Sequence, residues 1–357
     1  MIKRGGIGDW IIFAPALEQF RSALQGHAVD ITVYTEKLQS GIAAMIGLFD
    51  RVILFDQATR KGLFARHRLL AGLRREQFDL WIDADISRTN VGDAMSLASA
   101  AKVRVGYAAN ADSPCHAMIE NRAFTHTLKD NLGQVHMSER FERLLAFSAT
   151  LAIPESGIHS GGDAPRSGLR NFCWVGAQAD YFVVAPGASS PIRMWPATRF
   201  AELAKLIAAQ YRLRPVLVGT QGDEAACSEI ARLLDQPDLI NRAGKDSIAD
   251  LFKLIAGARL LLTNDSGPMH IGKATETPTL AIVSGADFTS YASYPKVSAN
   301  FSVAHSQDQS CFNCRWNCIY PSTGKNAIKP CLDAVTVAAA RGLADQLINQ
   351  TTPSNQQ

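Results

Sequence analysis

The chain has 357 residues, and 47% of them are hydrophobic, which is enough apolar material for two buried cores. A formal net charge of +3 gives no basis for nucleic-acid binding by bulk electrostatics, so we expect no nucleic-acid partner. The sequence shows no apolar run long enough to span a bilayer and no evident signal peptide, so the expected location is the cytoplasm.

The first half of the chain alternates strand and helix patterns. Residues 1–3 are either a very short first strand or the remainder of one that starts upstream, and a glycine-rich turn, Gly5–Asp9, follows. A strand this short would leave the first sheet without most of its central strand. The expected elements that follow are helices at 10–24, 36–46, 60–75, 91–101 and 138–151 and strands at 29–34, 51–55, 78–83 and 103–106. Residues 108–133 have no clear period and are expected to form an irregular surface connection.

Proline and glycine interrupt regular structure between residues 153 and 176, so an interdomain linker is expected there. In the second half, strands are expected at 181–185, 215–219, 239–241, 259–262 and 279–284 and helices at 198–211, 222–234, 247–256 and 268–274. Such alternation is typical of doubly wound parallel sheets. We therefore expect two α/β domains, residues 1–160 and 177–350, with a cysteine-rich loop at 311–331 and a disordered polar tail at 351–357.

The segment Leu260–His270 contains the end of a buried apolar strand and the start of a helix. Pro268 suits the first helical turn, and Asp265 or Ser266 suits its cap. Amides at such a helix start favour an anion such as phosphate, and ligands of open α/β sheets bind at the carboxyl ends of strands. The alternative is a capped turn without a ligand. His270, one turn into this helix, either faces a diphosphate or sugar or is structural.

The turn Gly5–Asp9 places small residues where the backbone turns tightly or approaches a ligand. Asp9 stands at the mouth of the following helix. A carboxylate at that position either caps the helix or acts as a general base toward a hydroxyl group.

A second loop, Pro186–Ser190, follows an expected strand and is succeeded by Arg193 and Trp195. The guanidinium group of arginine presents a planar fork of donors that suits phosphate oxygens. The alternative is a solvated loop that a buried tryptophan closes.

A third loop brings Asp223 and Glu224 to the end of another expected strand. Acids in this place accept hydrogen bonds from ribose hydroxyls in other nucleotide sites. Acids at a helix start also complement the helix dipole, so both interpretations stay open.

The cysteine-rich loop carries four thiols with spacings of two, three and twelve residues, namely Cys311, Cys314, Cys318 and Cys331. The first spacing is typical of metal sites, and the later ones are irregular. A structural zinc or iron ion, free thiols and a disulfide are the alternatives, and no metal is assigned to the chain at this stage.

Three motifs occur in a fixed order along the chain: Gly-Gly-Ile-Gly-Asp with Pro-Ala-Leu, then Pro-Gly-Ala-Ser with Arg-Met-Trp-Pro and Arg-Phe-Ala-Glu-Leu, then Asn-Asp-Ser-Gly-Pro-Met-His. This order resembles glycosyltransferase family 9, the ADP-heptose:lipopolysaccharide heptosyltransferases, from about residue 5 to 337. The resemblance implies a GT-B fold, in which two Rossmann-like domains face each other across a cleft. It also implies that the first domain serves the acceptor, that the second binds a nucleotide sugar, and that inverting transfer requires no metal or other cofactor.

The resemblance also assigns roles to residues. Asp9 becomes the general base, and Arg193 stands where the family usually has a lysine that meets charge on the leaving diphosphate. Ser189 matches a hydroxyl position near the diphosphate, and Asp265 matches the donor-site acid. The full donor-binding set expected is Gly8, Ser189, Asp223, Glu224, Asp265, Ser266, Gly267, Met269 and His270.

The expected reaction is transfer of heptose from ADP-heptose to a lipopolysaccharide-core or related acceptor, lipid-linked or glycan, at the inner face of the inner membrane. A basic stretch between residues 60 and 75 either attracts anionic lipid or a phosphorylated acceptor or is a solvated helix face. The alternatives are a catalytically inactive nucleotide-sugar-binding protein and another GT-B enzyme that uses a different nucleotide sugar. The sequence specifies no oligomeric state.

Overall fold

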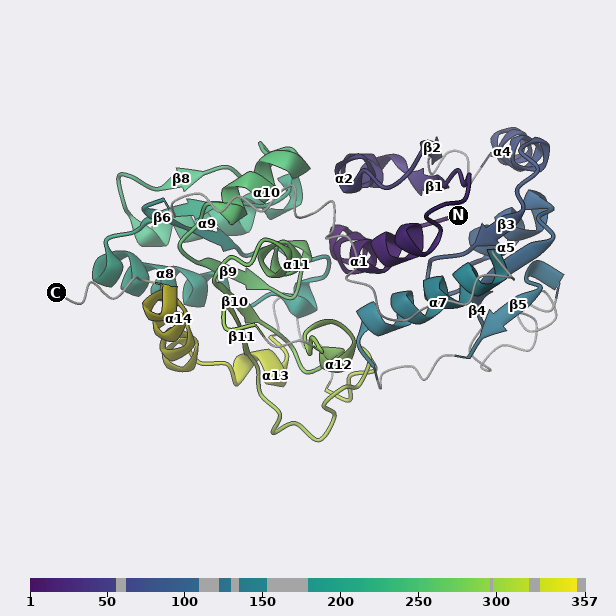
Figure 1. Ribbon diagram of the computed structural model, residues 1–357. Coiled ribbons are helices and arrows are strands. Elements are labelled where there is room, and N and C mark those ends of the chain that lie inside the picture. The colour runs from purple at the N-terminus through teal and green to yellow at the C-terminus, as the bar shows by residue number, and fades with distance from the viewer. Residues whose placement is uncertain are drawn as a thin grey trace. The chain divides into compact units, whose positions relative to one another are not determined.

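The computed structural model describes residues 1–55, 62–108, 122–129, 135–152, 179–295, 298–320 and 328–351. The chain divides into two compact units, Met1–Gly168 and Leu169–Gln357 (Figure 1). The linker expected at 153–176 lies outside the described residues, as do most of the irregular connection expected at 108–133 and all but the first residue of the polar tail. No helix in the described ranges is long and apolar enough to cross a membrane.

The first unit is an α/β unit with parallel strands. Its helices are α1 (Ile7–Ala23), η1 (Lys37–Gln39), α2 (Ser40–Ile46), α4 (Leu63–Arg75), α5 (Asn90–Ser99) and α7 (Met137–Ala152), and its strands are β1 (Thr32–Glu36), β2 (Arg51–Phe55), β3 (Leu80–Ile82), β4 (Val103–Tyr107) and β5 (His126–Leu128). β1 pairs with β2, and β3, β4 and β5 pair in that order. Helix α1 packs on α7, where the rings of Phe13 and Phe141 meet edge to face at 5.2 Å.

The segment Met1–Lys3 lies between the two groups of strands in this unit. Ile2 forms parallel bridges both to Tyr34 in β1 and to Asp83 just after β3. Its N–H donates to the carbonyl of Ile82 at 2.9 Å, and its side chain is fully buried. The short segment thus contributes isolated bridges at Ile2 rather than a full strand, and the strands on its two sides form the separate groups β1-β2 and β3-β4-β5.

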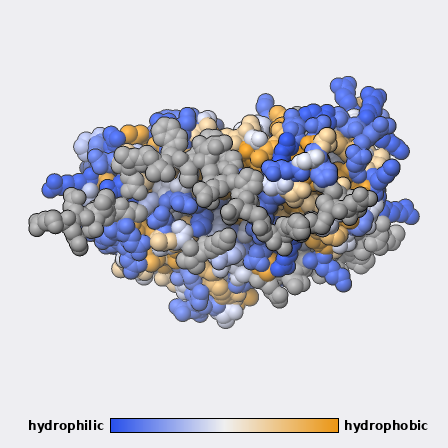
Figure 2. All heavy atoms as spheres, in the orientation of Figure 1, coloured by the Kyte–Doolittle hydropathy of each residue, from blue (hydrophilic) through white to orange (hydrophobic). Residues whose placement is uncertain are grey.

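Helix α4 presents the basic stretch that the sequence analysis identified. Its exposed side chains include Arg66, His67, Arg68, Arg74 and Arg75, and Figure 2 shows hydrophilic side chains gathered over this helix. The helix begins at Leu63 in the described part of the chain, three residues after the expected start, and residues 56–61 lie outside the described ranges.

The second unit is built on one six-stranded parallel sheet in the order β11-β10-β9-β6-β7-β8. The strands are β6 (Tyr181–Ala185), β7 (Arg214–Leu217), β8 (Ile240–Asn241), β9 (Leu261–Asn264), β10 (Thr279–Ile282) and β11 (Phe301–Ala304). The helices are η3 (Pro191–Arg193), α8 (Ala197–Tyr211), η4 (Gln221–Asp223), α9 (Glu224–Leu234), α10 (Ile248–Ala256), α11 (Gly267–Ala274), α12 (Phe288–Tyr291), α13 (Pro330–Asp333) and α14 (Val337–Thr351).

Helices cover both faces of this sheet, which explains why every residue of the central strands β9 and β10 is buried. Val184, Leu262 and Leu280 join the hydrophobic cluster formed with α8, α9 and α14, and α14 lies beside α8 in Figure 1. Ala281, the next residue of β10, belongs to a second cluster with Met269 of α11. Side chains alternate across a strand, so the two clusters lie on opposite faces. The predicted doubly wound sheet is present in this unit.

Candidate active site

Three loops meet at the carboxyl edge of the sheet in the second unit. They follow β6, β7 and β9, which are neighbours in the sheet. Asn264, fully buried at the end of β9, connects two of the loops. Its side-chain Oδ1 accepts from the N–H of Trp195 at 3.0 Å, and its Nδ2 donates to the carbonyl of Pro186 at 2.6 Å. The loop after β6 is thereby fixed to the strand that leads into α11. The sequence analysis did not identify Asn264 as a site residue.

Arg193 lies at the end of η3 in the loop after β6, and Trp195 two residues later anchors this loop. The indole Nε1 of Trp195 donates to the carbonyl of Val335 at 3.0 Å, and its buried ring meets the ring of Phe200 edge to face at 5.1 Å. The sequence analysis gave, as the alternative to a phosphate-binding loop, a solvated loop closed by a buried tryptophan. The burial of Trp195 is confirmed. The guanidinium carbon of Arg193 lies 4.1 Å from the centre of the Trp316 ring.

Asp265, which follows Asn264, is 5% exposed. Burial raises the pKa of its carboxyl group, the nearby charge of Arg193 opposes that rise, and the charge of Asp287 adds to it. A buried carboxylate depends on a neighbouring positive charge to stay ionised. The charges of Arg193 and Asp287 therefore act on Asp265 in opposite directions, and the expected diphosphate contact interacts electrostatically with the expected donor-site acid.

Helix α11 starts beside this group. Ser266 is its N-cap, with extended backbone, and the Ser266 side chain makes no cap hydrogen bond within the helix. The Ser266 hydroxyl lies 3.4 Å from that of Thr263, and both Ser266 and Gly267 are partly exposed. Met269, by contrast, is fully buried, and its N–H donates to the carbonyl of Ser266 at 3.0 Å. Ser266, Gly267 and Pro268 thus border solvent in this turn, and of these only Ser266 and Gly267 have a backbone N–H to offer.

His270 is buried on α11. Its Nδ1 lies 2.5 Å from the hydroxyl of Tyr294, and its ring meets the rings of Tyr291 and Tyr294 edge to face. Burial raises the pKa of Tyr294, and the charge of Asp265 adds to the effect. His270 is therefore packed and hydrogen-bonded to Tyr294, and the charge of Asp265 in turn affects the pKa of Tyr294.

Asp223 caps η4 in the loop after β7. Its Oδ2 accepts from the N–H of Thr220 at 2.8 Å and from the Thr220 hydroxyl at 2.7 Å. A Cβ atom on Gly187 would come within 2.3 Å of the Asp223 carboxyl group, so glycine at 187 allows the loops after β6 and β7 to touch. Glu224 is exposed at the start of α9, and Ser189 is exposed in the loop after β6.

Asp9 lies in the first turn of α1 in the first unit. The helix begins at Ile7, earlier than the expected start at residue 10, and Gly8 is buried within it. The Asp9 Oδ2 accepts from the N–H of Gly6 at 2.8 Å, so the carboxylate caps the helix. Gly5 has a φ of +93°, and a Cβ atom there would come within 2.7 Å of the Asp9 carboxylate. The turn therefore requires glycine at position 5 to admit the Asp9 side chain.

The first unit also contains charged side chains that the sequence analysis did not identify. They follow either Met1–Lys3 or strand β3. The Arg4 Nε lies 2.5 Å from the Asp85 carboxylate, and Arg88 pairs with buried Asp93 at 2.7 Å. Burial, together with the charge of Asp85, raises the pKa of Asp83 to about 8. The signal in the sequence is a run of charged residues directly after an apolar strand, at the sheet edge where ligands bind.

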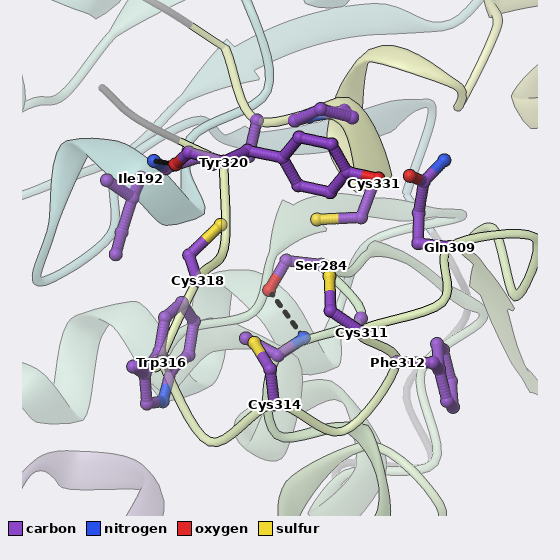
Figure 3. A pocket seen from close by; sticks show the side chains of 14 residues that line it. Ile192, Ser284, Gln309, Cys311, Phe312, Cys314, Trp316, Cys318, Tyr320 and Cys331 are labelled. Atoms are coloured by element: carbon purple, nitrogen blue, oxygen red, sulfur yellow. Dashed lines mark hydrogen bonds between the residues drawn. The ribbon is translucent and has the colours of Figure 1, made fainter.

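The four cysteines of the cysteine-rich loop carry free thiols and line one pocket with Ile192 and Trp316 (Figure 3). Burial raises the pKa of the Cys314 thiol, and the other three thiols add to that rise. Across the described residues, no three or more histidine, cysteine or acidic side chains are arranged to hold a metal ion. The thiols as placed do not fit the zinc or iron site that stayed open in the sequence analysis.

A family model described as Glycosyltransferase family 9 (heptosyltransferase) matches residues 66–319. The chain is 38% identical over 111 residues to lipopolysaccharide heptosyltransferase 2 of Salmonella typhimurium, a segment covering 29% of this chain and only 31% of that relative. It is 24% identical over 294 residues to lipopolysaccharide heptosyltransferase 1 of the same organism, covering 80% of this chain and 88% of that relative.

Two solved structures are similar over nearly their whole length. The structure of E. coli ADP-heptose lps heptosyltransferase II matches with a TM-score of 0.69 and 17% identity, covering 98% of both chains. The structure of E. coli heptosyltransferase WaaC with ADP matches with a TM-score of 0.70 and 19% identity, covering 97% of this chain and 98% of that one. These similarities confirm the predicted GT-B fold. Because the family model spans most of the chain, the predicted family is also confirmed, and the chain belongs to glycosyltransferase family 9, the heptosyltransferases.

Proposed function

We propose that the chain transfers heptose from ADP-heptose to a lipopolysaccharide-core or related glycan acceptor, with inversion at the anomeric carbon. The observation that carries the proposal is the connection through Asn264, which holds the loop bearing Arg193 against the strand that leads into α11. Family membership supports the reaction class. The names of the relatives, lipopolysaccharide heptosyltransferases, and the solved heptosyltransferase with ADP support the donor and the acceptor class.

The donor half of the reaction requires positive charge where the diphosphate leaves. As the bond between the anomeric carbon and the β-phosphate oxygen breaks, negative charge develops on the departing ADP. Arg193 offers a planar fork of donors to those oxygens, and the start of α11 at Ser266 and Gly267 offers backbone N–H groups. Ser189 contributes a hydroxyl donor, and Asp265 serves the sugar hydroxyls or keeps Arg193 in place. Asp223 and Glu224 are assigned to the ribose.

The acceptor half of the reaction requires a base. In the proposal, Asp9 removes the proton from the acceptor hydroxyl, the acceptor oxygen attacks the anomeric carbon, and ADP leaves from the opposite face. The partial exposure of Asp9 supports this role, because a general base must reach the acceptor hydroxyl. Gly5 admits the Asp9 side chain and so supports the position of the carboxylate.

The remaining parts of the proposal concern location and cofactors. We assign the protein to the cytoplasm, on the inner face of the inner membrane, where the exposed basic side chains of α4 attract anionic groups of the membrane or the acceptor. Arg193 and the amides of α11 supply the positive charge that a metal ion supplies in other glycosyltransferases, so no metal or other cofactor is assigned to catalysis.

A panel of nucleotide sugars tests the proposal. Thermal denaturation with ADP-, UDP- and GDP-sugars is expected to show stabilisation by ADP-heptose, and turnover is expected with ADP-heptose and a lipopolysaccharide-core acceptor. Stabilisation by ADP-heptose without turnover on any acceptor would favour an inactive binding protein. A preference for UDP- or GDP-sugars would overturn the donor assignment.

A further inference from the structure

The cysteine-rich loop places one aromatic ring against the charged end of Arg193. The Arg193 guanidinium carbon lies 4.1 Å from the centre of the Trp316 ring. Trp316 stands between Cys314 and Cys318 in sequence, 123 positions after Arg193. Figure 3 shows it in the wall of the same pocket as these two cysteines and Ile192, the neighbour of Arg193. The contact therefore joins the loop after β6 to the cysteine-rich loop.

The backbone around Trp316 adopts conformations that non-glycine residues rarely take. Asn313, Arg315 and Trp316 have φ angles of 60°, 49° and 67°. A bulky residue in the left-handed region is uncommon and persists only where surrounding contacts hold it.

Specific hydrogen bonds hold the loop in this form. The N–H groups of Asn313 and Arg315 donate to the carbonyls of Gly285 and Ala286, each at 2.6 Å. The Asn313 side chain donates to the Thr289 hydroxyl at 2.8 Å and accepts from the Thr289 N–H at 3.1 Å. The loop is thus attached both to the segment that follows β10 and to α12, and Trp316 is presented from a fixed support.

A guanidinium group held over the face of an indole ring is attracted to that face by a cation–π interaction. The contact restricts the orientations that the long arginine side chain samples. A long arginine side chain that is free to rotate loses side-chain entropy when it binds a ligand, and a side chain already held in one orientation loses less. An arginine held over a ring in this way is therefore better prepared to donate hydrogen bonds to one phosphate group.

We propose that Trp316 is a positioning residue that orients Arg193 toward the diphosphate of the nucleotide sugar, with the cysteine-rich loop as its support. The inference rests on the proposed function, because it takes Arg193 as the diphosphate contact. In this proposal Trp316 touches neither substrate nor the reacting atoms. It acts by restricting the orientation of the Arg193 guanidinium group.

The test is a double-mutant cycle on Trp316 and Arg193. We expect Trp316→Ala to weaken ADP binding, measured by calorimetry, by about five- to thirtyfold, and Trp316→Phe to recover most of that loss. In an Arg193→Ala background, Trp316→Ala is expected to change ADP affinity less than twofold, because the group that it orients is gone. Ile319→Ala, an exposed neighbour in the same loop, is the matched control and is expected to leave ADP affinity unchanged.

Each outcome decides the inference. If the losses caused by Trp316→Ala and Arg193→Ala simply add, Trp316 acts independently of Arg193 and the inference is overturned. If Trp316→Ala lowers the denaturation midpoint strongly, the comparison of Trp316→Phe and Trp316→Leu decides, because both fill the space and only phenylalanine offers an aromatic face. Turnover of ADP-heptose by the wild-type chain is measured in parallel. Wild-type turnover with additive losses contradicts the inference alone, whereas ADP binding without turnover contradicts the proposed function alone.

Discussion

The side-chain oxygen of Asn264 accepts a hydrogen bond from the backbone N–H of Trp195 at 3.0 Å. Both groups are buried, and the Asn264 amide nitrogen also donates to Pro186. One side chain thus satisfies two backbone groups of a loop that begins 78 positions earlier in the sequence. A buried polar group of this kind stabilises the structure only while its partners remain paired. The position of Arg193 therefore depends on Asn264.

Replacing Asn264 tests this dependence. Asn264→Ala leaves the Trp195 N–H and the Pro186 carbonyl buried without their partner, so the free energy of unfolding is expected to fall by about 2–4 kcal/mol. Denaturant unfolding measures the change. Asn300→Ala is the control, because Asn300 makes one exposed hydrogen bond to the carbonyl of Glu276, and its loss is expected to cost less than about 1 kcal/mol. Equal losses in the two variants would contradict the role assigned to Asn264.

Glycine at position 5 is expected to be necessary for the position of Asp9. Gly5→Ala forces a left-handed φ of +93° on alanine and brings its Cβ within 2.7 Å of the Asp9 carboxylate. We expect turnover to fall by about tenfold to a hundredfold, because a small displacement of a catalytic group is costly, while ADP affinity stays unchanged.

Gly26→Ala is the matched control for this variant. Gly26 has a similar φ of +89°, and nothing lies within 4 Å of the Cβ that alanine would add. Both variants therefore carry the same backbone strain, and only Gly5→Ala disturbs Asp9. Steady-state kinetics compares them, and an equal loss of turnover in Gly26→Ala would show that backbone strain alone explains the effect.

The ion pair between Arg21 and Asp50 predicts a pH dependence of stability in the first unit. The Arg21 guanidinium group, at 2.6 Å, lowers the pKa of Asp50 to about 2 from an ordinary value of 3.8. Because the folded-state pKa is the lower one, the pair stabilises the fold fully above about pH 4 and loses this effect as the pH falls toward 2. Asp50→Asn is expected to flatten the stability profile in that window in acid titrations followed by circular dichroism. An unchanged slope would contradict the prediction.

Removal of metal ions by chelation tests whether the protein itself supplies the positive charge that neutralises the leaving diphosphate. Because Arg193 and the amides of α11 are proposed to neutralise the leaving diphosphate, dialysis against EDTA is expected to leave turnover within about twofold of the untreated enzyme. Loss of turnover that added Mg²⁺ or Mn²⁺ restores would show that a metal ion supplies part of that charge. Arg193→Ala is expected to lower turnover by about a hundredfold or more in either buffer.

Much of the fold could be predicted because burial leaves a mark on the sequence. The apolar runs of β6, β9 and β10 and the helical periods between them indicate a covered parallel sheet. Two strands escaped prediction because β5 has three residues and β11 is only partly buried, so neither produces a clear pattern. The place of Met1–Lys3 depends on its partners at Tyr34 and Asp83, which the segment itself does not encode.

The candidate site was predictable only where short motifs carry it. Asp9, Arg193, Asp265 and Ser266 stand in loops whose composition indicates a turn at the end of a strand. Asn264 was missed because it acts through hydrogen bonds to residues that lie 69 and 78 positions away in the sequence. These residues become its neighbours only because β9 pairs with β6 in the sheet. The contact between Arg193 and the Trp316 ring could not be predicted from the sequence for the same reason.

The central claim is that Asp9 serves as the base in a transfer from ADP-heptose, and Asp9→Asn tests it most directly. Asparagine keeps the size of the side chain and an oxygen that accepts from the Gly6 N–H, but it cannot take up a proton. We expect turnover of ADP-heptose with a lipopolysaccharide-core acceptor to fall by about a hundredfold to ten-thousandfold while ADP affinity by calorimetry stays within about twofold. Turnover close to that of the wild type, with ADP affinity intact, would contradict the claim.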